Sequence, residues 1–335
     1  MHKFVLKPLF CYTMHIMNNR NNIENILESF DAVKNKIENF KPDLLLFCID
    51  FDGTLVKIQK NPYAAYLDRK YKKIIEKISN TKGIYYCVVT GRALEDIKER
   101  VGKDNDIIYS GNHGMEIKSF YKDLNINFIA GGKKSRIFIK IIKKAEKDLR
   151  KINIPGLIIE NKKYSVSLHC RMLSPENISK LKKNVKEVIK SNKTYEKFLH
   201  LKRGKKIVEV RPKLDWDKGK ACNFIIEKLS EMLIDKKIKK SKGGRINGDI
   251  KILKFCAGDD LTDESMFKVE SNRYDNYKDN VRVTGCDDNL KSAKALKMLN
   301  ISAVVGKKKS NADYYLDNYN QTYIIMEKLA DLFSL

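Results

Sequence analysis

The chain has 335 residues, of which 42% are hydrophobic, and it carries a formal net charge of +25. This length allows two domains, or one core with a large insertion, and the apolar content is sufficient for ordinary globular cores. No segment approaches the roughly 18 uninterrupted apolar residues of a membrane-spanning helix, so the sequence predicts a soluble protein without a membrane partner. The oligomeric state is left open.

The positive charge raises the question of nucleic-acid binding. The lysines are spread over the whole chain, and the basic clusters at 236–242 and 307–309 contain no interleaved aromatic residues that would stack on bases. A solvated basic surface is therefore the favoured interpretation, and no nucleic-acid partner is expected. The same charge would help to attract a phosphorylated substrate.

The cysteines and the N-terminal residues indicate the cellular compartment of the protein. None of the seven cysteines belongs to a Cys-x-x-Cys pair, and most lie in apolar, strand-like runs. This pattern indicates reduced, buried thiols of a cytoplasmic protein, and argues against a zinc site or a disulfide framework. Residues 1–21 lack a clear cleavage site, so a disordered N-terminal extension is favoured over a targeting segment.

The first part of the chain alternates predicted helices and strands. Apolar periodicity predicts an amphipathic helix over 22–40, and the apolar run Leu44–Asp50 is typical of a strand buried on both faces of a parallel sheet. A helix near 67–79, a strand at 84–90, a helix from Ala93 and a short strand before Gly111 continue the alternation. We predict an open parallel sheet with helices on both faces, whose first part occupies residues 22–118.

The pattern changes after Ser119. Residues 136–152 and 175–189 are predicted helices, and each precedes two predicted strands, at 157–160 and 164–171 and then at 198–201 and 205–211. Helix, strand, strand, repeated, predicts a small sheet with two helices on one face. Residues 119–211 are therefore expected to form a separate, inserted α+β domain.

The alternation of the core returns over residues 212–335. It comprises a helix at 217–233, a strand at 252–257, a helix near 262–269, strands near 281–284 and 303–305, and a closing helix at 321–333. The polar stretches 235–249 and 270–279 are predicted insertions without a chemical role.

Two aspartates directly follow the first buried strand, in Asp50-Phe51-Asp52-Gly53-Thr54-Leu55. Ligands of open α/β sheets bind at the carboxyl ends of strands, so both carboxylates emerge at the edge where chemistry is expected. Such paired carboxylates repel each other unless a cation joins them, and Mg²⁺ favours oxygen ligands of this kind. An Asp-Gly turn is the alternative, but a turn has no need of the first aspartate.

A second acidic cluster, Asp259-Asp260-Leu261-Thr262-Asp263-Glu264, follows the strand at 252–257. Thr262 and Asp263 are suitable helix caps, so part of the cluster can be structural. Capping alone does not account for four acidic residues within six positions, whereas a divalent-metal site does.

Two further motifs supply groups that bind phosphate. Thr90-Gly91-Arg92 follows a predicted strand, and Asp217-Lys218-Gly219-Lys220 opens a predicted helix. A hydroxyl, a guanidinium and an ammonium group can together bind the oxygens of a phosphoryl group, although each motif alone is a weak signal.

These four motifs, in this order, resemble those of the haloacid dehalogenase superfamily of phosphotransferases. Residues 111–116, 160–171, 204–212 and 216–221 further resemble trehalose-6-phosphate phosphatases, the plant-type members above all. The resemblance runs from about Ile23 to the C-terminus and departs mildly at Phe51 and Asn112, where the family usually has Tyr and Ser. It implies an α/β fold: a haloacid-dehalogenase-like Rossmannoid core with a parallel sheet and an inserted α+β cap domain.

The resemblance also implies a function. The protein would be a Mg²⁺-dependent phosphatase that hydrolyses trehalose 6-phosphate, the last step of trehalose biosynthesis, through an aspartyl-phosphate intermediate. Asp50 would be the nucleophile, and Asp52 would protonate the leaving sugar oxygen and then activate the water that releases phosphate.

The same resemblance assigns the supporting groups. Asp50, the backbone carbonyl of Asp52, and Asp259 would bind Mg²⁺. Thr90 and Lys218 would hold the phosphoryl oxygens, with Asp263 orienting Lys218.

The inserted domain would close over the site and exclude water. The candidates for substrate contacts are Arg92, His113, Glu116, Ser167, His169, Arg171, Lys206 and Glu209. The exposed face of a strand carries polar side chains in any case, so a purely structural role of these residues stays open.

Two alternatives to this function remain. The first keeps the chemistry but acts on another sugar phosphate, such as sucrose 6-phosphate, and only the cap would distinguish it. The second is a non-catalytic regulatory or nucleic-acid-binding protein, against which the intact set of carboxylates and Lys218 argues.

Overall fold

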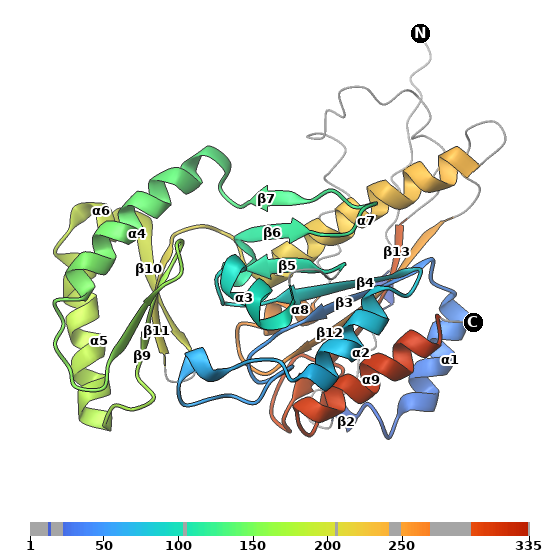
Figure 1. Ribbon diagram of the computed structural model, residues 1–335, viewed down its shortest axis with the longest axis horizontal. Coiled ribbons are helices and arrows are strands. Elements are labelled where there is room, and N and C mark those ends of the chain that lie inside the picture. Colours follow the sequence, from blue (N-terminus) through green and yellow to red (C-terminus); the bar gives the residue numbers. More distant parts are fainter. Residues whose placement is uncertain are drawn as a thin grey trace, which may run out of the picture.

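Two separate sheets organise the computed structural model, which describes residues 13–14, 23–102, 106–204, 207–240, 249–268 and 296–333. One sheet has ten strands and the other has four (Figure 1). The large sheet is mostly parallel and carries helices, which confirms the predicted α/β class. No helix in these described ranges is long and apolar enough to cross a membrane.

The large sheet has the order β2-β14-β13-β12-β3-β4-β5-β6-β7, with β1 beside β13. It is parallel from β2 to β5 and antiparallel from β5 to β7. Its strands are β1 (Thr13–Met14), β2 (Glu24–Asn25), β3 (Leu44–Ile49), β4 (Ile84–Val89), β5 (Ile108–Gly111), β6 (Glu116–Ser119), β7 (Asn127–Ile129), β12 (Ile250–Gly258), β13 (Leu296–Val305) and β14 (Tyr314–Leu316).

Both faces of this sheet are covered by helices. Alternate residues of β3 show the division: Leu45 and Phe47 belong to one apolar cluster, whereas Leu46 and Cys48 belong to the other. The first cluster includes side chains of α1 (Phe30–Phe40), α2 (Arg69–Ser79), α3 (Leu94–Val101) and α9 (Tyr319–Asp331), and the second those of α7 (Lys218–Lys240) and α8 (Glu264–Phe267). A strand buried on both faces needs apolar side chains at every position, which is why β3 shows no polar alternation.

The small sheet and its helices form a second module beside the large sheet (Figure 1). Its strands pair antiparallel in the order β10-β11-β9-β8. It consists of α4 (Ser135–Leu149), β8 (Ile158–Asn161), β9 (Val166–His169), α5 (Pro175–Lys190), α6 (Lys193–Phe198), β10 (Leu199–Gly204) and β11 (Ile207–Pro212). One face of its strands packs with the helices into a separate apolar core, through Val166, Leu168, Val208 and Val210. The alternate residues, which include Ser167 and Glu209, therefore point to the opposite face.

Most predicted elements are confirmed, with shifts of a few residues at their ends. The predicted helix over 22–40 is wrong before Phe30, because residues 24–25 form β2 and the helix begins only at Phe30. The side chain of Asn25 accepts a hydrogen bond from the Leu27 N–H and donates to Asp317, which fixes a turn before the helix. Helix α6 was not predicted.

Four further differences concern the ends of predicted segments. Strand β6 ends at Ser119, where the sequence pattern changes, and β7 continues the large sheet beyond that residue. Helix α7 continues to Lys240, into the first predicted insertion, and β13 is longer than the strand predicted at 303–305. Within the predicted N-terminal extension, Thr13–Met14 pair with β13. The strand predicted at 281–284, the insertion at 270–279 and the rest of the extension lie outside the described residues.

Candidate active site

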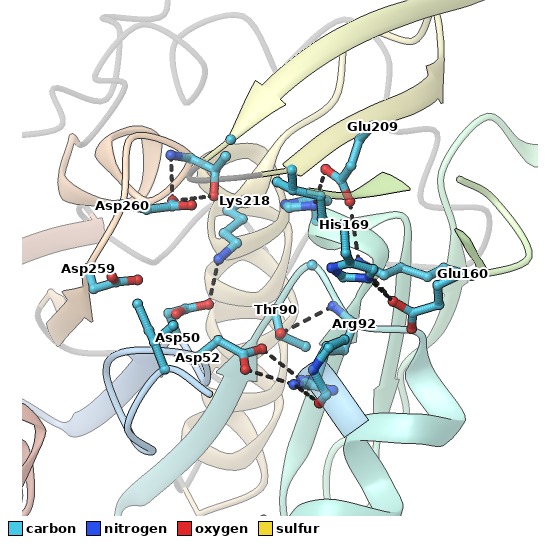
Figure 2. Close-up of a pocket in the computed structure, with 18 of the residues that line it drawn as sticks. Asp50, Asp52, Thr90, Arg92, Glu160, His169, Glu209, Lys218, Asp259 and Asp260 are labelled. Atoms are coloured by element: carbon cyan, nitrogen blue, oxygen red, sulfur yellow. Dashed lines mark hydrogen bonds and ion pairs between the residues drawn. The ribbon is translucent and has the colours of Figure 1, made fainter. Parts of the chain in front are cut away.

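The candidate site lies where adjacent parallel strands end. Strand β3 pairs with β12 on one side and with β4 on the other, with Cys48 opposite both Cys256 and Cys87. Asp50, Thr90 and Asp259 each follow one of these three strands, so the chain brings them to the same edge of the sheet. Figure 2 shows these side chains around one pocket, together with residues of the small sheet.

A buried ion-pair network fixes Asp50. The Lys218 ammonium group donates to Asp50 Oδ1 at 2.7 Å and to Asp263 Oδ1 at 2.6 Å. Lys218 is 2% exposed and Asp263 is fully buried. The second oxygen of Asp263 accepts the backbone N–H groups of Asp259 and Asp260, both at 2.9 Å. Asp263 therefore holds both the lysine and the loop that carries Asp259.

The network favours the charged form of Lys218 but not that of Asp50. Burial, followed by the charge of Asp263, raises the pKa of Asp50 well above its usual range, and Lys218 offsets only part of this rise. Burial alone would lower the pKa of Lys218, but Asp263 and Asp50 outweigh it and raise that pKa. Lys218 thus stays charged, whereas a further cation would help to keep Asp50 ionised.

Carboxylate oxygens of Asp50, Asp259 and Asp263 lie within 4.8 Å of one another. Asp50 and Asp259 line the pocket, whereas Asp263 lies behind Lys218 and accepts three hydrogen bonds, so Asp50 and Asp259 are the carboxylates suited to a metal ion. Gly53 permits this arrangement, because a Cβ atom at that position would lie 2.4 Å from Cγ of Asp259. Buried, closely spaced carboxylate oxygens fit a small, hard cation such as Mg²⁺.

Asp52 is held by Arg92 and not by Lys218. Arg92 Nε donates to Asp52 Oδ2 and Arg92 Nη2 donates to Asp52 Oδ1, both at 2.7 Å (Figure 2). The same guanidinium group donates to Asp96 at 3.0 Å and to the carbonyl of Pro62 at 2.9 Å. We predicted Arg92 as a substrate contact, but its guanidinium group donates four hydrogen bonds to groups within the protein.

His113 joins the large sheet to the small one. Its backbone has a positive φ of 56°, and Gly91 makes room for its ring, since a Cβ there would lie 2.4 Å from His113 Cε1. Arg211 Nη2 approaches His113 Nε2 to 2.5 Å, and Glu209 lies 3.2 Å from the same nitrogen. Burial first, and then Arg211, lower the pKa of His113 to about 4, so the neutral ring accepts from Arg211.

The polar face of the small sheet is internally paired. Glu209 accepts hydrogen bonds from Ser167 at 2.8 Å, from Lys162 at 3.3 Å and from Arg211. Burial would raise the pKa of Glu209, but Lys162, His113 and Arg211 lower it well below its usual range, so this carboxylate is ionised.

Two other residues of this face have partners as well. His169 pairs with Glu160 at 2.8 Å (Figure 2). Arg171, which follows β9, donates to the carbonyl of Gln59 in the loop after β3 and so connects the two modules.

The structure brings most of the predicted site residues to one pocket. The predicted residues that line it are Asp50, Asp52, Thr90, Arg92, His113, His169, Arg171, Glu209, Lys218 and Asp259. Asp263 lies behind Lys218, and Ser167 lies behind Glu209. Glu116 is buried and bonded to Asn112 and Lys163. Lys206 lies outside the described residues.

Several lining residues were not predicted. They include Gln59, Glu160, Lys162, Arg211 and Asp260. Arg211 carried a usable signal, since it is two residues from Glu209 on one strand and so shares its face. Gln59 carried none, because a loop residue shows no periodicity.

A solved structure shares this fold. The chain matches the C-terminal domain of a C. albicans trehalose-6-phosphate phosphatase with a TM-score of 0.61 and 20% sequence identity, covering 93% of this chain and 99% of that one. At this identity the likeness shows the fold alone: a mostly parallel core sheet with a second, smaller antiparallel sheet beside it.

The sequence comparisons identify the family of the chain. Residues 48–319 match the model of the trehalose-phosphatase family, and the chain belongs to this family. The probable trehalose-phosphate phosphatase H of Arabidopsis thaliana is 32% identical over 67% of this chain and 60% of its own length. The probable phosphatase E of the same plant is 28% identical over 91% of this chain and 74% of its own length. This chain thus spans only about three fifths of relative H.

Proposed function

We propose that the protein is a Mg²⁺-dependent phosphatase that hydrolyses trehalose 6-phosphate to trehalose and phosphate, the last step of trehalose biosynthesis. The observation that carries the proposal is the buried pairing of Asp50 with Lys218 beside Asp259, in a chain that belongs to the trehalose-phosphatase family. The family supports the substrate class, and the site geometry supports the chemistry.

In the first step, a carboxylate oxygen of Asp50 attacks phosphorus, and the bond between phosphorus and the sugar oxygen breaks. Asp52 gives a proton to that oxygen as it leaves. Asp52 then takes a proton from water, which attacks the aspartyl-phosphate, so that phosphate leaves and Asp50 is regenerated. Lys218 and the Thr90 hydroxyl stabilise the phosphoryl oxygens in both steps.

Asp50 and Asp259, with the backbone carbonyl of Asp52, would hold Mg²⁺. When bound, the ion offsets the repulsion between the attacking carboxylate and the phosphoryl group. Burial and the charge of Asp263 raise the pKa of Asp50, and Lys218, which also pairs with Asp263, offsets only part of this rise. A bound cation would offset the rest, which supports this assignment.

The small sheet would be the cap, and the inserted domain would run from the end of β7 to the end of β11. We assign sugar contacts to His113, His169, Arg171 and Glu209, which line the pocket. The geometry gives no support to the predicted substrate contacts from Glu116 and Ser167, which do not line the pocket. It also gives none to the contact from Arg92, whose guanidinium group already donates four hydrogen bonds within the protein. Cys48 and Cys256 are among the buried free thiols, which supports a reducing compartment such as the cytoplasm.

Phosphate release from a panel of esters with Mg²⁺ tests the proposal. We expect trehalose 6-phosphate to be preferred over glucose 6-phosphate and sucrose 6-phosphate. Equal rates on the three sugar phosphates would contradict the assigned substrate but leave the chemistry intact. An absence of phosphate release from all of them, and from p-nitrophenyl phosphate, would favour a regulatory protein.

A further inference from the structure

Arg92 lies between Asp52 and a loop of the core. Its guanidinium group forms a two-pronged ion pair with Asp52, while Asp96 and the carbonyl of Pro62 hold its remaining edge. The Arg92 side chain is only 7% exposed, whereas that of Asp52 is 36% exposed. The buried arginine is therefore the fixed partner of the pair, and the aspartate is the partner that needs fixing.

We propose that Arg92 is a positioning residue that acts through Asp52 and does not bind the substrate. This inference rests on the proposed function, in which Asp52 donates a proton and later accepts one. Arg92 orients the carboxylate of Asp52 toward the reacting oxygen. It also stabilises the negative charge that remains on Asp52 when its proton passes to the sugar oxygen, as the electron pair of the broken bond passes to that oxygen.

The planar guanidinium group of Arg92 fixes the orientation of the Asp52 carboxylate. A carboxylate at the end of a short side chain can rotate, and a single cation would not set its plane. Two parallel hydrogen bonds of 2.7 Å set both its position and its plane. Proton transfer depends steeply on such placement, since a shift of about 1 Å can cost roughly a hundredfold in rate.

The loop that holds Arg92 is also contacted by the small sheet. Arg171 donates to the carbonyl of Gln59, and Arg92 donates to that of Pro62, three residues further on. Arg100 donates to the carbonyls of Tyr63 and Ala65. The orientation of Asp52 is therefore anchored to the same loop that meets the cap.

Arg100 offers a matched control. It is as buried as Arg92, it pairs with the same Asp96, and it holds the same loop. Among the described residues it forms hydrogen bonds with Asp96, Tyr63 and Ala65, and not with Asp52. Replacing Arg100 therefore reproduces the structural damage of replacing Arg92 without removing the support of Asp52.

The experiment compares two phosphate esters in the same protein preparation. Trehalose 6-phosphate has a poor leaving group that needs a proton, whereas p-nitrophenyl phosphate has a good leaving group that does not. The value of kcat/KM reports steps up to departure of the leaving group, and the ratio of kcat/KM for the two esters is independent of the folded fraction. A variant that is partly unfolded is thus still informative.

We expect Arg92→Gln to lower kcat/KM on the order of a hundredfold for trehalose 6-phosphate, and at most about threefold for p-nitrophenyl phosphate. Asp52→Asn should show the same selectivity, and the double variant should lose no more than Asp52→Asn alone, because both act on one step. Arg92→Lys, which keeps the charge without the fork, should lose part of the selective activity. Arg100→Gln should leave the ratio unchanged.

Equal losses on both esters in Arg92→Gln, or the same change of ratio in Arg100→Gln, would overturn the proposal. A rise in KM alone for both esters would show instead that Arg92 contacts the phosphate. Assays of the wild-type protein distinguish a failure of this inference from a failure of the proposed function. If it hydrolyses p-nitrophenyl phosphate and another sugar phosphate but not trehalose 6-phosphate, the assigned substrate is wrong, and the same ratio is measured with that other sugar phosphate.

Discussion

The absence of a Cβ atom at Gly53 is expected to be required for the metal site that we propose at Asp50 and Asp259. A Cβ atom at this position would lie 2.4 Å from Cγ of Asp259 and within 2.7 Å of both its carboxylate oxygens. Carbon atoms pack at about 3.5–4.0 Å, so Gly53→Ala must displace the Asp259 carboxylate by roughly 1 Å. Metal sites tolerate deviations of about 0.2 Å, so we expect the Mg²⁺ concentration for half-maximal activity to rise by about tenfold or more.

A second glycine provides the control. Gly53 has a φ of 94°, so the alanine variant also has a strained backbone, which costs about 1–2 kcal/mol. Gly83 has a φ of 82°, but the nearest atoms to a Cβ there are 3.9 Å away. Gly83→Ala should thus show the loss of stability without the change in Mg²⁺ dependence. Phosphate release is titrated with Mg²⁺ and stability with denaturant. If both variants lose stability equally and keep the wild-type Mg²⁺ dependence, Asp259 does not bind the ion where we place it.

Three further predictions concern separate parts of the molecule. Asp50→Asn should lower the rate of phosphate release on the order of a thousandfold or more, while the Tm stays equal or rises, because burial disfavours the ionised carboxylate; unchanged activity would refute the mechanism. The pKa of His113 is about 4 in the folded protein and 6.5 ordinarily, so the unfolded chain binds this proton first as the pH falls. The free energy of unfolding should therefore decrease between about pH 6.5 and 4, and less so in His113→Asn; denaturant titrations with parallel pH dependences in both proteins would contradict this. Ser174 caps α5 by accepting the Asn177 N–H, so Ser174→Ala should lower the free energy of unfolding by about 1 kcal/mol and leave kcat/KM unchanged, which urea titration and the phosphate assay check together.

The core could be predicted from the sequence because burial dictates its pattern. Strand β3 is apolar at every position and lies between two other strands, so its sequence alone indicates a parallel sheet. Ligands of open α/β sheets bind at the carboxyl ends of strands, and this rule selected Asp50 as a candidate site residue. The pairing of β3 with β12 could not be predicted, because about two hundred residues separate the two strands and no local sequence pattern indicates that they are neighbours. Helix α6 was missed because six residues are too few to show a helical period.

Partners of the charged side chains were less predictable than their location. The motif Thr90-Gly91-Arg92 predicted that Arg92 lies at the site, and Arg92 lines the same pocket as Asp50 and Lys218. The direction of its guanidinium group depends on Asp96 and on the Pro62 carbonyl, and the latter belongs to a loop without periodicity. A strand pattern gives the face on which a residue lies, whereas a hydrogen-bond partner depends on which loop or module is opposite.

The two halves of the site differ in how they are prepared for a substrate. Lys218 and Asp263 are fixed by buried ion pairs before any ligand arrives, so the cost of ordering these groups is met in folding. On the small sheet, Glu209 and His169 already have protein partners. Under the proposed function, a sugar hydroxyl that binds there therefore gains only the difference between a new hydrogen bond and the one it replaces. A sugar that displaces those bonds without forming new ones leaves a buried charge unpaired, which costs more than a good fit gains. Under the proposed function, discrimination between sugars therefore comes from the penalty for a poor match at Glu209, while the rate of phosphoryl transfer is set at Asp50.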